Sequence, residues 1–324
     1  MIQELIENRI VILDGGMGTM IQRYNLSEED FRKGHFESHK NSLKGNNDLL
    51  SITRPEIIKE IHLAYLKAGA DIIETNTFSG TAIAQADYHL EEAVYEINFQ
   101  SAKIAKEVTS SFIERKCYVA GSIGPTNRTA SMSPDVNDPS FRAINFDQLV
   151  VAYSEQVNAL IDGGVDILLV ETVFDTLNAK AALFAIDSVF ESRKVKLPIM
   201  VSGTITDQSG RTLTGQTAEA FLTSLSHMPL LSIGLNCALG AKLMEPYLKI
   251  LAQTSSFATS AHPNAGLPNE FGEYDESPQM MSEQIEVFFQ NNYLNIIGGC
   301  CGTTPEHIKA IKEISLKYDP RQWK

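Results

Sequence analysis

The segment that decides the fold reads Leu294-Asn295-Ile296-Ile297-Gly298-Gly299-Cys300-Cys301-Gly302-Thr303-Thr304-Pro305. It predicts a short apolar strand that runs through glycines into two adjacent cysteines and then into a helix. Thr303 and Glu306 have the spacing of a capping box, and Pro305 suits a first helical turn. Neighbouring side chains of an extended strand point to opposite faces, so both thiols reach one point only if the glycines let the backbone bend. The cysteines are therefore expected where a strand ends and a helix begins.

The other two cysteines of the chain lie at opposite ends of apolar runs. Cys237 ends one run, whereas Cys117 begins another. In a parallel sheet Cys237 shares an edge with Cys300 and Cys301, and Cys117 lies about 23 Å away at the far edge. Three thiolates without a fourth protein ligand are typical of a catalytic zinc site, which keeps one position open. Taken singly, each cysteine is also compatible with a small buried hydrophobe, the interpretation favoured for Cys117.

Eight apolar, β-branched runs alternate with helical patterns along the chain. The strands are predicted at Ile10–Asp14, Asp71–Asn76, Tyr118–Gly124, Asp166–Thr172, Pro198–Thr204, Leu231–Cys237, Phe257–His262 and Leu294–Gly299. The helices are predicted at Pro55–Ala68, Leu90–Ile113, Phe146–Ile161, Ala179–Phe190, Ala218–Leu225, Ala241–Leu251, Pro278–Phe289 and Pro305–Leu316, after a short helix at Ile2–Asn8. This alternation predicts a single-domain (β/α)8 TIM-type barrel over residues 1–324. An open doubly wound sheet is the second choice, because no strand-flanked Gly-x-Gly-x-x-Gly segment supports it.

The composition restricts the partners of the protein. The chain carries 40 acidic and 27 basic residues, a formal net charge of -13. This balance argues against nucleic acid and anionic membrane surfaces as partners. The N-terminal residues do not have the pattern of a signal peptide, and no apolar run reaches membrane-spanning length. We expect a cytoplasmic protein.

Acidic side chains also occur at predicted strand ends, where the chemistry of a TIM-type barrel gathers. Asp14 is followed by a glycine turn that begins at Gly15, and Glu171 ends the fourth strand. Acids that hold an ammonium group, together with backbone amides that hold a carboxylate, would form an amino-acid site. Each acid alone also fits a structural role, as a helix N-cap for Asp14 and as a hydrogen-bond acceptor for Glu171. Asn264, two residues after His262, is a further candidate for substrate binding.

Two long loops, Pro125–Asn145 and Asn264–Ser277, follow predicted strands. Long ordered loops on the catalytic face of a barrel usually form lids or surfaces for a partner. We expect one of these roles here, although a mobile insertion has the same sequence pattern.

Several motifs at the strand ends are shared with a known family. They are Asp14-Gly15-Gly16-Met17-Gly18-Thr19, Gly69-Ala70-Asp71-Ile72-Ile73-Glu74-Thr75-Asn76-Thr77-Phe78, Gly234-Leu235-Asn236-Cys237-Ala238 and Gly298-Gly299-Cys300-Cys301-Gly302-Thr303. With these motifs the sequence resembles the zinc-dependent homocysteine S-methyltransferases over nearly its whole length. Gly45–Leu50, Gly124–Ser131, Pro134–Pro139 and Phe271–Asp275 are similar to the homocysteine module of cobalamin-dependent methionine synthase.

This resemblance implies that Cys237, Cys300 and Cys301 bind Zn²⁺, with the sulfur of L-homocysteine as the fourth ligand. It also implies that Asp14 and Glu171 hold the substrate amino group and that amides near Gly15 hold its carboxylate. The sequence does not contain the Asp-x-His-x-x-Gly signature of cobalamin binding. The expected methyl donor is therefore methylcobalamin carried on another module or chain. A stand-alone enzyme that uses S-methylmethionine or betaine is an alternative, and a barrel with structural zinc or redox thiols is a more remote one.

Overall fold

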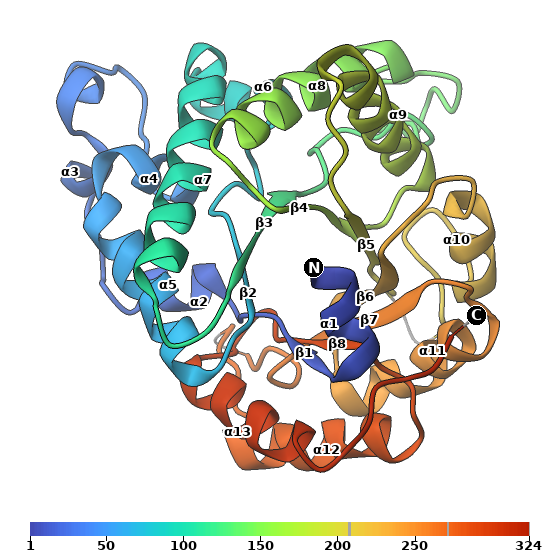
Figure 1. Ribbon diagram of the computed structural model, residues 1–324. Coiled ribbons are helices and arrows are strands. Elements are labelled where there is room, and N and C mark those ends of the chain that lie inside the picture. The colour runs from blue at the N-terminus through green and yellow to red at the C-terminus, as the bar shows by residue number, and fades with distance from the viewer. Residues whose placement is uncertain (207–208, 271, 324) are drawn as a thin grey trace.

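Eight parallel strands form one sheet with the order β1-β8-β7-β6-β5-β4-β3-β2. The structure is a computed structural model and describes residues 1–206, 209–270 and 272–323; Phe271 of the predicted Phe271–Asp275 motif lies outside them. The strands are β1 Val11–Ile12, β2 Ile72–Glu74, β3 Tyr118–Ile123, β4 Ile167–Val173, β5 Ile199–Gly203, β6 Ser232–Gly240, β7 Ala258–Asn264 and β8 Ile296–Ile297. They surround a common axis (Figure 1). The (β/α)8 barrel is confirmed, with each strand inside or within three residues of its predicted run.

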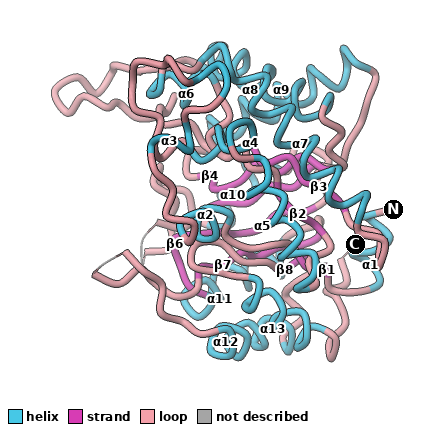
Figure 2. Tube along the Cα trace, turned by 90° about the vertical axis from the view of Figure 1, so that its left-hand side faces the viewer, coloured by secondary structure: helices cyan, strands magenta, loops and turns pink. Residues whose placement is uncertain are grey.

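The helices lie around the outside of the strands, except α1, which lies across one end of the barrel (Figures 1 and 2). They are α1 Ile2–Asn8, α2 Met17–Gln22, α3 Glu28–Phe31, α4 Leu50–Thr53, α5 Pro55–Ala68, α6 Ala82–Gln85, α7 Val94–Ser111, α8 Phe146–Asp162, α9 Thr176–Arg193, α10 Ala218–Leu225, α11 Ala241–Thr254, α12 Pro278–Gln290 and α13 Pro305–Ser315. Short 3-10 helices lie at η1 Gly34–Phe36, η2 Asn47–Leu49, η3 Ala86–Tyr88 and η4 Glu91–Ala93. The helices α1, α5 and α10 have their predicted bounds; in α5, Pro55 starts the helix and Gly69, at φ 114°, ends it. The short helices between β1 and α5 were not predicted, because segments of four to six residues carry little periodicity.

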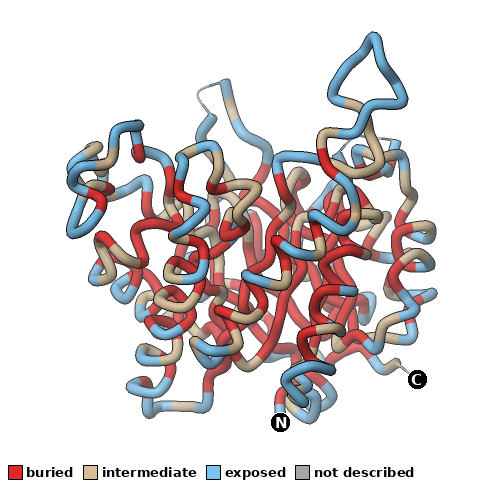
Figure 3. Tube along the Cα trace, turned by 90° about the horizontal axis from the view of Figure 1, so that it is seen from above, coloured by how far each residue is buried: buried red, intermediate tan, exposed pale blue. Residues whose placement is uncertain are grey.

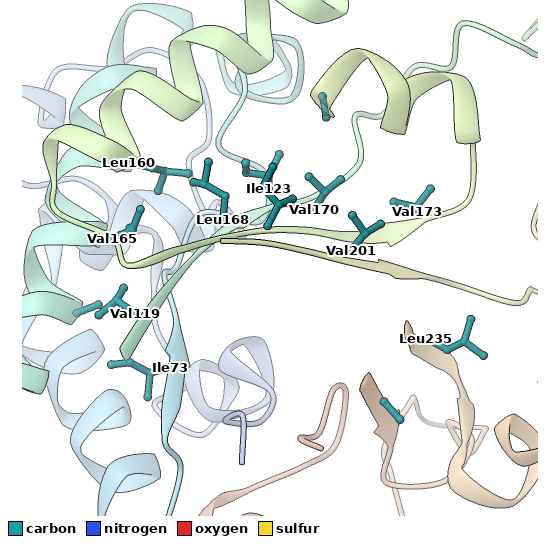
Figure 4. Packing of buried hydrophobic residues seen from close by; sticks show 14 of the residues in the cluster. Ile73, Val119, Ile123, Leu160, Val165, Leu168, Val170, Val173, Val201 and Leu235 are labelled. Atoms are coloured by element: carbon teal, nitrogen blue, oxygen red, sulfur yellow. The ribbon is translucent and has the colours of Figure 1, made fainter. Parts of the chain in front are cut away.

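Side chains of the strands alternate between two apolar layers. Val11, Leu13, Ile72, Ile167 and Leu169 belong to a buried cluster inside the barrel, where Ile2 and Ile6 of α1 join them. Their strand neighbours belong to the cluster between strands and helices. Figure 4 shows Leu168 of β4 beside Leu160 of α8, with Val119 and Val170 of the strands in the same cluster. The strands are thus buried on both faces, as their near-continuous apolar runs predict.

The two ends of the barrel differ. Helix α1 and both termini lie at one end, and exposed loops project from the other (Figures 2 and 3). Cys117 precedes β3 at the terminal end, where its Sγ lies 4.0 Å from the carbonyl oxygen of Ala70. The strand ends that carry the other cysteines face the loops. Among the described residues, no helix combines the length and apolar character needed to span a membrane.

The barrel is closed between β1 and β2 by a short seam. One parallel bridge joins Leu13 to Ile72, and the backbone amides of Asp71 and Asp14 donate to Ile12 and Ile72. The carboxylate of Asp71, fully buried, reinforces the seam because it accepts the amide of Ile12 at 3.0 Å. Arg9 binds both of its oxygens, at 2.7 and 2.8 Å. One carboxylate therefore ties β1 to β2 at the point with the fewest ladder hydrogen bonds.

We expect Asp71→Asn to lower the free energy of unfolding by about 3 kcal/mol, because it leaves Arg9 without its buried counter-charge and weakens the closing seam. Urea unfolding followed by circular dichroism measures the change. The control is Glu107→Gln, which breaks the exposed Lys59–Glu107 ion pair of 2.7 Å. This control should change stability by no more than about 0.5 kcal/mol. Equal effects of the two substitutions would contradict a special role for the seam.

Candidate metal centre and substrate pocket

Three thiols meet at the loop end of the barrel, as the sequence predicts. Cys237 lies in β6, and Cys300 and Cys301 follow β8; β7 lies between these two strands in the sheet. The Sγ of Cys301 lies 3.6 Å from that of Cys237 and 4.0 Å from that of Cys300. All three sulfur atoms lie within 4.8 Å of one another. A tetrahedral zinc ion with Zn–S bonds of about 2.3 Å requires sulfur atoms about 3.8 Å apart, so the cluster fits three of four vertices.

The backbone around the thiols is unusual at specific residues. Cys237 and Ala238 both have left-handed conformations, with φ of 58° and 54°. Gly302 has φ 79°, and a Cβ at this position would lie 2.3 Å from the Cβ of Tyr274. Of the three glycines expected to bend the cysteine loop, Gly302 alone has the left-handed conformation; Gly298 and Gly299 instead lie against neighbouring atoms without room for a side chain.

The helix after the cysteines begins at Pro305, as predicted, but its capping residue is not the predicted Thr303. Thr304 is the N-cap of α13, and its hydroxyl and amide contact Nδ1 of His307. The hydroxyl of Thr303 donates to the carbonyl of Cys300 at 2.6 Å and accepts the amide of Gly16 at 2.9 Å. The predicted cap at Thr303 is thus wrong: this side chain instead joins the cysteine loop to the glycine turn after β1.

The three clustered thiols shift one another's pKa values in different directions. Hydrogen bonds from Cys237 and Cys300, and a further one from Tyr274, lower the pKa of Cys301 to about 3. The pKa of Cys237 rises to about 11. A hydrogen bond from Cys300 favours the thiolate form of Cys237, but the hydrogen bond to Cys301 and burial favour the thiol form and outweigh it. Hydrogen bonds to both partners and burial also raise the pKa of Cys300. Three thiolates this close together repel one another, so a cation is needed to ionise the full set.

A pocket of about 310 Å³ joins the thiols to four carboxyl groups. The predicted acids Asp14 and Glu171 line it, and so do Glu74 and Asp48, to which no role was assigned from sequence. One oxygen of Asp14 accepts the amide of Glu74 at 3.0 Å, and the other is buried without a hydrogen-bond partner. Glu171 accepts a hydrogen bond from the hydroxyl of Ser122. The free oxygen of Asp14 can accept a hydrogen bond from a ligand.

Burial dominates the electrostatics of these acids. It raises the pKa of Glu171 to about 7, although the bond from Ser122 opposes the shift. Burial likewise raises the pKa of Asp48 to about 7, against the amide of Ser79. For Asp14 and Glu74, burial and repulsion from Glu171 raise the pKa well above the usual range. A bound cationic group would favour the ionised forms, so the pocket suits an ammonium group.

Of the two remaining predicted site residues, Gly15 and Asn264, one lines the pocket. Gly15 lines the pocket, and a Cβ there would meet the hydroxyl of Thr303 at 2.7 Å, so no larger residue fits. Asn264 is buried and outside the lining, and its side-chain oxygen accepts the amide of Cys301 at 3.1 Å. Asn264 therefore fixes the cysteine loop and does not line the pocket. His262 does line the pocket, and its Nε2 is buried without a partner.

The loop after β3 is anchored at its start and exposed beyond it. The amide of Ala130 donates to the side chain of Asn178 at 3.0 Å, and the hydroxyl of Ser131 donates to Asp175 at 2.5 Å. Farther along, Val136 and Phe141 are 93% and 47% exposed. Large exposed apolar side chains also lie on the loops after β2, β5 and β7. They are Phe78, Leu213 and Leu267. These five side chains, the apolar rim, lie on loops at the open end of the barrel.

Comparison with solved structures finds the same fold. The metallated form of the homocysteine methyltransferase MmuM from Escherichia coli is similar with a TM-score of 0.72 and 22% identity, over 94% of this chain and 96% of that chain. Its oxidized form is similar with a TM-score of 0.73 and 21% identity, over 94% and 95% of the two chains. At this level of identity the likeness shows the fold.

Comparison with protein families identifies the chain more specifically. Residues 11–315 match the family described as homocysteine S-methyltransferase. The match includes every strand and every cysteine of the barrel. The chain therefore belongs to the homocysteine S-methyltransferase family.

Proposed function

We propose that the protein transfers a methyl group to the thiolate of L-homocysteine to form methionine, with Zn²⁺ bound by Cys237, Cys300 and Cys301. The observation that carries this proposal is the shared pocket, in which three thiols and four carboxyl groups face one space of about 310 Å³. A thiol-containing amino acid is a ligand whose two ends suit these two sets of groups. Membership of the family supports the same substrate.

The donor set supports zinc. Thiolates are preferred zinc ligands, and three of them with an open fourth position are typical of a catalytic rather than a structural site. When bound, zinc deprotonates a coordinating thiol, which in water has a pKa of about 8.5. A structural zinc site or a redox pair would not require the buried acids beside the thiols.

The acids would hold the amino group of the substrate. The unpartnered oxygen of Asp14 accepts one ammonium hydrogen and Glu171 a second, while backbone amides of the turn at Gly15 bind the carboxylate. Asn264 has a different role in this proposal from the one predicted from sequence: it keeps Cys301 in place through the amide of that residue. Glu74 and Asp48 add negative potential to the same pocket. The substrate thus lies with its sulfur toward the cysteines and its amino group toward β1 and β4.

Methylcobalamin carried on another module or chain is the proposed methyl donor. The apolar rim at the open end of the barrel supports a large donor that is presented by a macromolecule. The rim consists of Phe78, Val136, Phe141, Leu213 and Leu267. A free betaine or S-methylmethionine would favour an aromatic enclosure around its cation. Among the described residues that line the pocket, two are aromatic, Phe78 and Tyr88.

The test is single-turnover methylation of homocysteine by the zinc-loaded protein. We expect methionine to form with methylcobalamin, free or protein-bound, and much more slowly with betaine or S-methylmethionine. Mass spectrometry of the products measures each rate. Fast reaction with either small donor and none with methylcobalamin would contradict the proposed donor. No methionine from any of the three donors would contradict the proposed function itself.

A further inference from the structure

The side chain of Asn236 joins three strands at the substrate pocket. It lies in β6 directly before Cys237 and is 1% exposed. Its oxygen accepts the amide of Thr172 at 2.9 Å and the hydroxyl of Ser202 at 2.6 Å. Its nitrogen donates to the hydroxyl of Thr172 at 2.7 Å. Thr172 directly follows Glu171, and Asn236 directly precedes Cys237. The side chain of Asn236 therefore connects the backbone next to a proposed metal ligand with the backbone next to a proposed substrate acid.

These contacts form where the regular ladders of the sheet are interrupted. The register of β4 against β5 shifts between Val170 and Val173, and that of β6 against β7 shifts between Asn236 and Gly240. Thr172 and Cys237 both have left-handed backbone conformations, with φ of 54° and 58°. Such conformations cost energy in residues other than glycine and persist only where surrounding contacts hold them. The bonds of Asn236 supply those contacts.

Strands β4 and β6 are not neighbours, since β5 lies between them. The backbone ladder therefore does not fix the distance between their ends directly. Asn236 spans this gap over Ser202 of β5 and uses both ends of its amide group. A buried asparagine with three hydrogen bonds is a rigid connection, because losing any of them leaves a buried polar group unpaired.

We propose that Asn236 is a positioning residue that sets the separation between Cys237 and Glu171, and thereby selects an amino acid of one chain length. This inference rests on the proposed function, in which the substrate sulfur lies at the cysteines and its ammonium at Glu171. With that separation fixed, homocysteine spans the two points, whereas cysteine is one methylene shorter and does not satisfy both. If the connection is loosened, the two points are free to move and the preference falls.

The experiment measures the affinities of homocysteine and cysteine for zinc-loaded wild type, Asn236→Ala and Ser202→Ala. For Asn236→Ala we expect homocysteine to bind roughly tenfold more weakly, with a smaller change for cysteine, so that the ratio of the two affinities falls at least about threefold. Ser202, which lies outside the pocket lining, donates one hydrogen bond to the side-chain oxygen of Asn236, and Ser202→Ala removes it. In this variant the homocysteine-to-cysteine affinity ratio should also fall, by a smaller factor than in Asn236→Ala. Zinc content is measured for each folded variant and should stay at one ion per chain, because all three thiols remain.

The matched control is Asn295→Ala. Asn295 is also fully buried and also joins segments through its amide, to Thr259 and Arg321, but at the opposite end of the barrel. This control should lower the thermal midpoint and leave the homocysteine-to-cysteine ratio unchanged. A ratio that stays at the wild-type value in the folded Asn236 and Ser202 variants, or that falls equally in Asn295→Ala, overturns the positioning role. Failure of the wild type to bind homocysteine would instead overturn the proposed function, and Ser202→Ala decides the question if Asn236→Ala does not fold.

Discussion

Cys301→Ser is expected to abolish stoichiometric zinc binding and methionine formation together. Cys301 is central in the cluster, 3.6 Å from one sulfur and 4.0 Å from the other, and hydrogen bonds from both neighbouring thiols lower its pKa. A serine hydroxyl is not ionised at neutral pH and is a poorer zinc ligand than a thiolate. Removing a residue that only supports a ligand costs roughly 10–100-fold in metal affinity, so removing the ligand itself should cost more. Without the metal, about 3% of a free thiol is ionised at pH 7.

Cys117→Ser is the matched control for this experiment. Cys117 is buried, whereas the three cluster cysteines are partly exposed, and it lies before β3, beside the carbonyl of Ala70 and at the opposite end of the barrel from the cluster. Zinc content after dialysis against a chelator, measured by atomic emission, should equal that of the wild type in Cys117→Ser and fall close to zero in Cys301→Ser. A chain that loses its metal when Cys117 is replaced would show that the strand-end argument is wrong.

The sequence predicts the barrel well because each strand is buried on both faces. Runs such as Ile167–Val170 have no polar member, and this pattern is specific to strands covered by helices. The predicted meeting of Cys237 with Cys300 and Cys301 follows from topology alone, since the ends of parallel strands share one edge. Local backbone details were harder to predict. The hydroxyl of Thr303 binds the amide of Gly16 instead of capping the helix, and Asn236, beside the left-handed Cys237, binds Thr172 of β4; both of these partners are remote in sequence.

Of the two pocket acids not predicted from sequence, Glu74 and Asp48, the first could have been found from the alternation of side chains along its strand. Inside the barrel, Ile72 of β2 and Leu169 of β4 are followed two residues later by Glu74 and Glu171. Since side chains two apart share a face, the apolar layer at the base continues into a polar layer at the pocket. The same step leads from Ala120 to Ser122. Asp48 has no such signal, because it lies in the 3-10 helix η2 outside the strands.

Glu171→Gln is expected to weaken homocysteine binding by at least about 30-fold while zinc remains bound. The substitution keeps the shape of the side chain and an oxygen for the hydroxyl of Ser122, but it removes the charge that faces the substrate ammonium. Loss of one partner of a buried charge pair costs about 2 kcal/mol or more, which corresponds to this factor. Isothermal titration calorimetry with zinc-loaded protein measures the affinity. Glu155→Gln, on α8 and outside the pocket lining, is the control that should bind homocysteine like the wild type.

The dependence of homocysteine affinity on pH gives the same prediction a second, independent readout. Burial raises the pKa of Glu171 to about 7, so the side chain is neutral below this pH and charged above it. The ammonium gains an ion pair only with the charged form; affinity should therefore rise as the pH increases through 7, and binding should release a proton from Glu171. Ionisation of the homocysteine thiol contributes a rise of its own, but that part is shared by wild type and Glu171→Gln. Glu171→Gln should thus lose the rise in affinity near pH 7 and keep the rise that comes from the thiol. Identical pH profiles of affinity for the two proteins would place the ammonium at another acid of the pocket.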